Sequence, residues 1–203
     1  SKCAAQREAH LLYYLMLDDE VGRAFADALC RAARRGVRCR LLLDAVGAKR
    51  GLRAFARSLR AAGVKVQPML AGGLAWRRSS RMDLRNHRKI AVIDGRIGYT
   101  GSQNLACAEF VRGHPNREVV ARVRGPVVAQ LAALFASDWY IETGEVLDIY
   151  ATRADGGATP ASRVTYLYRT VLSRPPDAEE LKLVTAALDR QRTIFATDPT
   201  AAA

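Results

Sequence analysis

A histidine and a lysine lie two residues apart in this chain, and two neutral polar side chains follow them. His87 and Lys89 stand before an apolar segment, and Ser102 and Asn104 come after the next one. Side chains alternate faces along a strand, so His87 and Lys89 are expected to project to the same side. A hairpin that returns through Tyr99 would bring Ser102 and Asn104 near them. An imidazole, an ammonium group and two polar groups would then converge on one spot.

This set of groups suits phosphodiester chemistry. The reaction takes a nucleophile for phosphorus, a cation on the non-bridging oxygens and further hydrogen-bond donors as the charge redistributes. A lone histidine at the start of a strand is more often structural, so the interpretation rests on the whole set. His10 and His114 belong to no such set and are expected at the surface. The sequence has no HExxH, no Cys or His pairs at ligand spacing and no carboxylate cluster in the core segment, so no metal or other cofactor is predicted.

The turn between the two apolar segments has its own signature. Asp94-Gly95 separates residues 89–93 from residues 96–100, and a DG pair in this setting predicts a two-residue hairpin turn. Backbone conformation alone would favour aspartate at this position. We therefore interpret Asp94 as structural.

Strands and helices alternate ahead of this hairpin. Three apolar runs have strand length and two intervals between them have helical periodicity, in the order 11–16, 21–32, 37–44, 52–59 and 64–70. Each helix ends in Gly-Val leading into a strand, which is typical of βαβ units with parallel strands. Residues 118–123 predict a further strand, and residues 127–141 a long helix opened by a proline. The predicted fold is α/β, with a mixed β-sheet flanked by helices.

Length and composition are those of a soluble globular protein. The chain has 203 residues, of which 49% are hydrophobic and 26% charged, which excludes disordered, collagenous and coiled-coil proteins. No apolar run approaches the roughly 18 residues that span a bilayer, and the first six residues lack the layout of a signal peptide. Cys3, Cys30, Cys39 and Cys107 show no CxxC pairing and are interpreted as reduced thiols in a reducing compartment.

The charge balance predicts an anionic partner. The chain has 32 basic and 20 acidic side chains, a net charge of +12, and 27 of the basic residues are arginine, which suits bidentate phosphate contacts. A genome rich in GC codons would also favour arginine over lysine. Location is more informative, because residues 1–150 carry 25 basic and 14 acidic groups, and residues 77–89 alone carry a net +5. We expect the anion site in the first part of the chain.

The composition changes after residue 150. Residues 151–162 are rich in glycine and proline for their length, which indicates a linker. Two amphipathic helices are predicted after it, the second opened by a capping box formed by Asp177 and Glu180. The predicted domains are residues 1–150, the linker, and a helical tail over residues 163–203.

The segment from His87 to Asn104 fits the pattern H-x-K-x4-D-x6-G-S-x-N, which resembles the signature of the phospholipase D superfamily. The surrounding sequence narrows the resemblance to the N-terminal half of the bacterial cardiolipin synthase family. The stretches that carry it lie within residues 8–148 and are 13–14, 18–22, 35–37, 41–44, 85–89, 138–139 and 143–145. The tail, through residues 168–169 and 173–177, weakly resembles the C-terminal helices of an unrelated bacterial family of unknown function.

The resemblance implies roles for the residues of the motif. His87 would be the nucleophile that forms a phosphohistidine. Lys89 and Asn104 would hold phosphate oxygens, and Ser102 would support that pocket. Asp94 occupies the aspartate position that the family signature counts with the catalytic residues, without a direct chemical role.

An acid after the motif completes the set of catalytic candidates. Glu118 lies where the family places this acid, although the family usually has Trp-Arg-Asp and this chain has Asn-Arg-Glu at residues 116–118. By resemblance, Glu118 would accept a hydrogen bond from Nδ1–H of His87 and leave Nε2 free to attack.

Superfamily members place two such motifs face to face across an approximate two-fold axis. One histidine attacks and the other protonates the leaving group. This sequence contains one motif, so two chains would pair symmetrically or the chain is half of a longer enzyme, a truncated or fused frame. The resemblance favours the second alternative.

The leading hypothesis is a phosphatidyltransferase of the cardiolipin synthase type, acting on phosphatidylglycerol at an anionic membrane surface. It would be peripheral, on the cytoplasmic side, and completed by a second motif from a copy or a separate chain. One alternative is a homodimeric phosphodiesterase or nuclease, whose basic stretch 77–89 would track a nucleic-acid backbone. Another is a half-domain that binds anionic lipid without catalysis.

Overall fold

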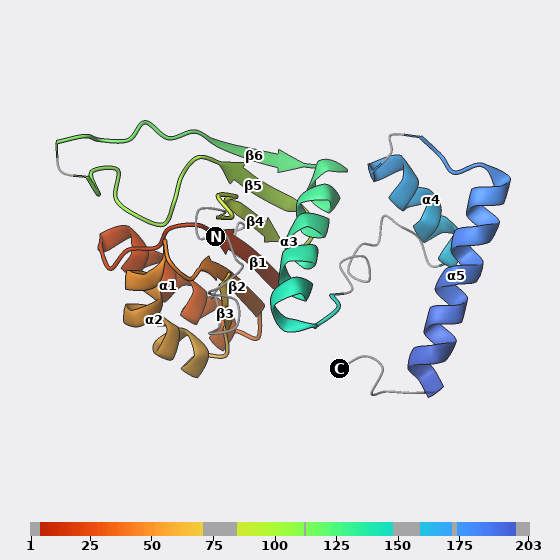
Figure 1. Ribbon diagram of the computed structural model, residues 1–203, viewed down its shortest axis with the longest axis horizontal. Helices are drawn as coiled ribbons and strands as arrows, with labels where there is room; N and C mark the ends of the chain where they lie inside the picture. Colours follow the sequence, from red (N-terminus) through yellow and green to blue (C-terminus); the bar gives the residue numbers. More distant parts are fainter. Residues whose placement is uncertain (1–4, 71–84, 112, 148–158, 172–173, 198–203) are drawn as a thin grey trace, which may run out of the picture. The chain divides into compact units, whose positions relative to one another are not determined.

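We describe a computed structural model of the chain over residues 5–70, 85–111, 113–147, 159–171 and 174–197 (Figure 1). The chain divides into two compact units, Ser1–Val123 and Arg124–Ala203. The first unit is built on a β-sheet, and the described part of the second is helical. The α/β fold class expected from the sequence is confirmed.

The sheet has six strands in the order β3-β2-β1-β4-β5-β6. The strands and the two helices between them are β1 (Glu8–Tyr13), α1 (Glu20–Arg34), β2 (Arg38–Asp44), α2 (Lys49–Ala61), β3 (Lys65–Met69), β4 (Ile90–Ile93), β5 (Ile97–Gly101) and β6 (Val120–Arg124). β1 pairs in parallel with β2, and β2 with β3, whereas β4 runs antiparallel to β1 and β5 antiparallel to β4. The sheet is therefore mixed, and its parallel half comes from the predicted βαβ units.

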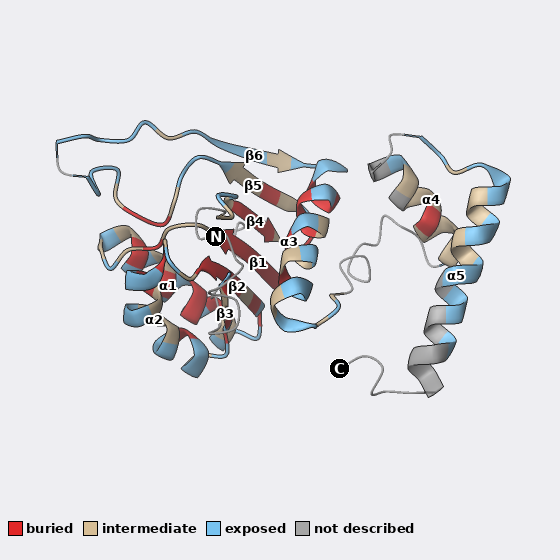
Figure 2. Cartoon of the chain, viewed as in Figure 1, coloured by how far each residue is buried: buried red, intermediate tan, exposed pale blue. Residues whose placement is uncertain are grey.

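Helices α1 and α2 cover one face of the parallel half of the sheet (Figure 1). Leu11 of β1 and Leu41 and Leu43 of β2 alternate with residues of the other face, and they pack with Leu29 of α1 and Leu59 of α2 in one apolar core. Figure 2 shows the buried residues concentrated in these strands and on the inner sides of the two helices. This core holds the strand ends that carry the polar motif.

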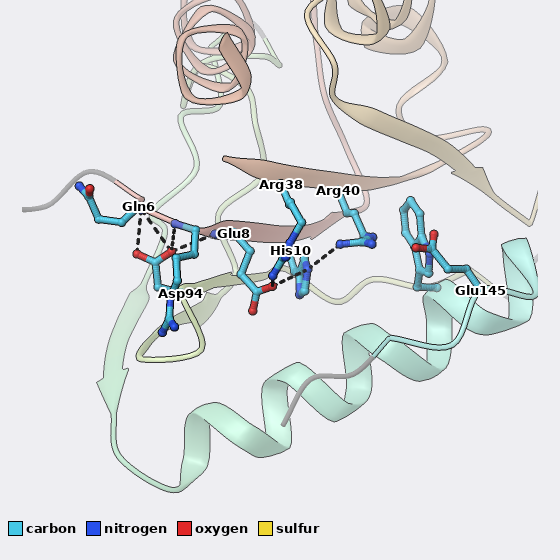
Figure 3. Close-up of polar contacts among 9 residues, drawn as sticks. Gln6, Glu8, His10, Arg38, Arg40, Asp94 and Glu145 are labelled. Atoms are coloured by element: carbon cyan, nitrogen blue, oxygen red, sulfur yellow. Dashed lines mark hydrogen bonds and ion pairs between the residues drawn. The ribbon is translucent and has the colours of Figure 1, made fainter. Parts of the chain in front are cut away.

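The predicted hairpin joins β4 to β5. Asp94 and Gly95 both have positive φ, 53° and 62°, as a type I′ turn requires. The Asp94 carboxylate accepts hydrogen bonds from the backbone N–H groups of Gln6, Arg7 and Glu8 at 2.8–3.2 Å (Figure 3). The turn is thereby attached to the start of β1.

Polar and charged side chains pair across β1 and β2 on the other face of the sheet (Figure 3). Parallel register sets Glu8 opposite Arg38 and His10 opposite Arg40. A Glu8 oxygen lies 3.1 Å from Arg38 Nη2, and His10 Nε2 lies 3.3 Å from Arg40 Nη1. His10 is 3% exposed, so the expectation of a surface histidine was wrong. The reason is that β1 begins at Glu8, earlier than the apolar run, and lies between β2 and β4.

The second unit contains α3 (Val127–Thr143), α4 (Pro160–Val171) and α5 (Ala178–Thr197) in its described residues. The predicted capping box of α5 is confirmed, because Glu180 N–H donates to Asp177 and Asp177 N–H donates to Glu180. Part of the predicted linker lies outside the described residues. Its last residues are helical, since Pro160 opens α4 and Thr159 accepts from the N–H of Ser162. The predicted domain boundaries remain a prediction.

Two further sequence expectations concern the thiols and the membrane. Cys30, Cys39 and Cys107 are free thiols, while Cys3 lies outside the described residues. In the part of the chain that the structure describes, no helix combines the length and the apolar character needed to cross a bilayer.

Candidate active site

The polar motif gathers at one edge of the sheet, where the parallel strands end. Antiparallel pairing sets Ile90, the first residue of β4, opposite Leu12 near the end of β1, and opposite Thr100 near the end of β5. At this edge, His87 and Lys89 lie just before β4, and Ser102 and Asn104 lie just after β5. Ligands of open α/β sheets characteristically bind outside the carboxyl ends of parallel strands.

His87 is exposed and stacks on an aromatic ring. Its imidazole lies parallel to the Tyr14 ring, with ring centroids 3.9 Å apart and an interplanar angle of 20°. Tyr14 directly follows β1. Stacking covers one face of the imidazole and leaves its edge, which carries both nitrogens, available for chemistry. The Tyr14 contact was not predicted, although Tyr13-Tyr14 is one of the stretches that carry the family resemblance.

Lys89 belongs to the same group of contacts. Its Nζ donates to the His87 carbonyl oxygen at 2.6 Å and lies 5.6 Å from the centroid of the Tyr14 ring. Burial lowers the pKa of Lys89 below its usual value, and the nearby carboxylate of Glu118 opposes this shift. A partly desolvated cation at this position would interact strongly with a phosphate oxygen.

Asn104 is held by its side-chain oxygen, and its amide N–H group has no hydrogen-bond partner among the described residues. Its side-chain oxygen accepts the backbone N–H of Leu15 at 3.1 Å. The following residues are joined to the chain after β1, with Leu105 N–H donating to Leu15 and Leu17 N–H donating to Leu105. Asp19 completes this connection, because one carboxylate oxygen accepts from Gly22 N–H at the start of α1 and the other from Cys107 N–H.

Ser102 and Glu118 lie on adjoining segments. Ser102 Oγ accepts from Val119 N–H at 3.0 Å, and Ser102 N–H donates to the Val119 carbonyl at 2.9 Å. Glu118 is half-buried beside Lys89. Within the described residues Glu118 and His87 form no hydrogen bond, so the role that the resemblance implies for Glu118 remains a prediction.

Asp94 is not part of this group. β4 separates it from His87 and Lys89, and its carboxylate is occupied by backbone N–H groups at the opposite end of the strand. Burial raises the pKa of Asp94, but the hydrogen bonds from Glu8, Gln6 and Arg7 outweigh this effect and hold the pKa below its usual value. Arg77, Arg78 and Arg81 of the basic stretch lie outside the described residues.

An apolar cavity of about 370 Å³ adjoins the motif. Lys89 and Asn104 line it, and Lys89 is the one charged residue among its lining residues. Aliphatic and aromatic side chains from β1, α1, β4 and β5 form most of the remaining wall, namely Leu11, Val21, Phe25, Ala91, Ile93 and Tyr99. The cavity thus joins one cation and two side-chain amides, those of Gln103 and Asn104, to a largely apolar wall.

The fold is that of the phospholipase D family. A phospholipase D family member, Nuc from Salmonella typhimurium, superimposes with a TM-score of 0.51 over 67% of this chain and 80% of its own, at 17% identity. NucT from Helicobacter pylori superimposes with a TM-score of 0.50 over 66% of this chain and 80% of its own, at 18% identity.

The sequence defines the family within that fold. The family model described as the cardiolipin synthase, PLD-like domain matches residues 3–139, and the chain belongs to this family, as its motifs predicted. Cardiolipin synthase A of Yersinia pseudotuberculosis and of Yersinia pestis are both 33% identical to it over 204 residues. These alignments cover 96% of this chain and therefore extend beyond the range 8–148, while the chain spans 42% of the length of these relatives.

Proposed function

We propose that this chain forms one half of a phosphatidyltransferase site that joins two phosphatidylglycerol molecules. The observation that carries the proposal is the convergence of His87, Lys89 and Asn104 at one sheet edge beside an apolar cavity. Membership of the cardiolipin synthase family supports it.

In the first step, Nε2 of His87 would attack the phosphorus of one phosphatidylglycerol. The bond between phosphorus and the glycerol oxygen breaks, glycerol leaves with a proton from a general acid, and a phosphohistidine remains. In the second step, a hydroxyl of another phosphatidylglycerol attacks the same phosphorus. The P–N bond breaks, a base takes the hydroxyl proton, and His87 is regenerated. Lys89 and the Asn104 amide would stabilise the phosphoryl oxygens in both steps.

The general acid would come from a second motif. The leaving alkoxide has a pKa far above neutral, so a proton donor is needed. By analogy with the two-motif arrangement of the superfamily, we propose that a second histidine, from a second copy or a separate chain, supplies this proton. The assembled site would act at an anionic membrane surface, on the cytoplasmic side and without insertion of this chain.

The cavity supports an amphiphilic substrate over a nucleic acid. A nucleic acid presents many phosphates and polar bases, whereas the cavity offers one cation and an apolar wall. An acyl chain beside a single phosphodiester fits this lining. The net charge of +12 favours the alternative, a homodimeric phosphodiesterase or nuclease. A half-domain that binds lipid without catalysis is the third candidate function.

Covalent trapping tests the chemistry. The full chain, together with a chain that supplies the second motif, is incubated with phosphatidylglycerol vesicles, and the acid-labile phospho-adduct is located by mass spectrometry. We expect it on His87, absent from His87→Ala and retained in His114→Ala, which alters an exposed histidine. An adduct from oligonucleotide but not from lipid would favour the nuclease alternative. Vesicle binding without any adduct would favour the binding-only half-domain.

Binding of monomeric ligands tests the cavity. Lysophosphatidylglycerol should bind at least tenfold more tightly than glycerophosphoglycerol, because each buried methylene contributes about 0.8 kcal/mol. Ala91→Leu, which fills part of the cavity, should remove most of this difference. Ala61→Leu, the same change at an exposed position of α2, should preserve it. Equal affinities for the two ligands in the unmodified chain would contradict an acyl-chain site.

A further inference from the structure

A buried ion pair lies where the parallel strands end, next to the segment that contains His87. Arg85 Nη1 is 3.6 Å from Asp44 Oδ2, and the two side chains are 10% and 0% exposed. The other Asp44 oxygen accepts backbone N–H groups of Val46 and Gly47 at 3.0 and 2.8 Å. Oδ2 has no hydrogen-bond partner among the described residues, so the Arg85 guanidinium supplies its countercharge.

The pair connects the ends of two strands to the start of β4. Asp44 is the last residue of β2, and Arg85 Nη1 also donates to the carbonyl of Leu70, just after β3, at 3.1 Å. Asn86 adds a contact to the same edge, because its Nδ2 lies 3.7 Å from Met69 Sδ. Its side-chain oxygen accepts from Arg88 N–H at 3.1 Å. Residues on both sides of His87 are therefore anchored by named contacts.

We propose that the Arg85–Asp44 ion pair positions His87, by fixing the segment before β4 so that the imidazole rests on Tyr14. The Tyr14 ring comes from the end of β1, whereas the ion pair fixes the segment against β2 and β3. His87 is thus located by all three parallel strands. Neither Arg85 nor Asp44 would touch the reacting phosphate, so both are positioning residues.

The physical reason lies in what a buried ion pair contributes. Desolvation of the two charges offsets much of their attraction, so such a pair adds little stability over apolar residues of equal size. It would fix geometry, because the fully buried Asp44 carboxylate is shielded from solvent that could replace its partner. A nucleophile displaced by about 1 Å loses on the order of 10²-fold in rate, so this geometric constraint would matter at His87.

Nuclear magnetic resonance of the full chain tests the positioning directly. Labelled histidine gives separate ring signals, assigned with the His10, His87 and His114 substitutions. Stacking on Tyr14 should shift the His87 ring protons upfield of those of exposed His114. Arg85→Met should abolish this shift, and Arg85→Lys should retain part of it. Arg23→Met, in the exposed Arg23–Asp18 pair, should leave it unchanged.

The chemical readout rests on the proposed function and is scored separately. At saturating phosphatidylglycerol, Arg85→Met should form the His87 adduct about 10²-fold more slowly, with little change in half-saturating concentration. Should Arg85→Met fail to fold by circular dichroism, Arg85→Lys and Asp44→Asn decide the question. A His87 signal that keeps the full upfield shift of the unmodified chain in a folded Arg85 or Asp44 variant would overturn the proposal. Absence of an adduct in the unmodified chain when the second motif is supplied would refute the proposed function but leave the spectroscopic result decisive for positioning.

Discussion

At the amino end of β4 the chain presents His87 and Lys89, and at the carboxyl end of the same strand it presents Asp94. The His87 imidazole is exposed, with one face on Tyr14 and its nitrogen-bearing edge open. The Asp94 carboxylate instead accepts N–H groups from three successive residues at the start of β1. One short signature thus combines groups arranged for chemistry with a group engaged by the backbone.

The difference shows how a sequence signature should be interpreted physically. A carboxylate whose oxygens already accept several N–H groups is poorly suited to act as a base, since protonation would weaken those hydrogen bonds. An imidazole held by stacking keeps its nitrogens for a substrate. The spacing H-x-K-x4-D therefore reflects the length of β4 as well as the chemistry. The two catalytic candidates directly precede the strand, and the aspartate forms the turn that follows it.

The largest expected effect is on activity, and it distinguishes the two ends of β4. His87→Ala should abolish the phospho-adduct and reduce turnover by roughly 10⁴-fold or more, as loss of a nucleophile does in other enzymes. Asp94→Ala, compared per folded molecule, should stay within a few-fold of the unmodified chain. Turnover is measured with a chromogenic phosphodiester under conditions where the second motif is present. Equal losses in the two variants would show that Asp94 takes part in the chemistry.

The second prediction concerns stability, where the effect is expected at Asp94. Asp94→Ala should lower the free energy of unfolding by about 1–2 kcal/mol, because it removes charge-assisted hydrogen bonds at a partly exposed site. Asp27→Ala, an exposed position on α1, should have little effect. Both are measured by urea unfolding at neutral pH.

The same variant should have a characteristic pH dependence. The pKa of Asp94 is lower in the folded chain than its usual value, so the carboxylate contributes stability above that usual value. This contribution is lost as the pH falls through the lowered pKa. The difference between the unmodified chain and Asp94→Ala should therefore be greatest at neutral pH and disappear in acid. A difference that persists unchanged in acid would contradict the assigned role of the carboxylate.

Much of this arrangement could be predicted from sequence because it depends on local patterns. The Asp94-Gly95 turn defines β4 and β5, and it returns the chain so that Ser102 and Asn104 follow β5 at the end of the sheet where Lys89 precedes β4. These features follow from the alternation of side chains along strands and the backbone preferences of the turn residues.

The features that the sequence did not predict all depend on contacts between residues far apart in the chain. His10 is buried because pairing with β2 and β4 extends β1 back to Glu8, where the hydrophobic pattern gives no strand signal. The Arg85–Asp44 contact joins residues separated by α2 and β3. An ion pair between two such residues produces no periodic pattern in the sequence from which it could be predicted. Tyr14 occupies the end of a strand, where burial patterns do not define the direction of a side chain.

The smallest expected effect concerns Glu118, on the reactive side of the comparison. Burial lowers the pKa of Lys89, and the Glu118 carboxylate counteracts that shift. Glu118→Gln should therefore lower the pKa of Lys89 further, and the cation should be lost at lower pH. We expect phosphodiester binding to change only a few-fold at neutral pH, with its alkaline limit displaced toward neutrality. Glu109→Gln, at an exposed position, should leave the alkaline limit in place.

The pH profile of turnover also distinguishes two roles for Glu118. If Glu118 acts on Lys89 alone, only the alkaline limb should move, because that limb reports loss of the ammonium charge. If Glu118 instead accepts a hydrogen bond from His87 once substrate is bound, the acidic limb should move as well, toward lower pH. The reason is that a carboxylate partner raises the pKa of an imidazolium and its removal lowers it. A profile unchanged at both limbs would exclude both roles. Glu118 would then be only a part of the segment that the hydrogen bond between Val119 and Ser102 holds in place.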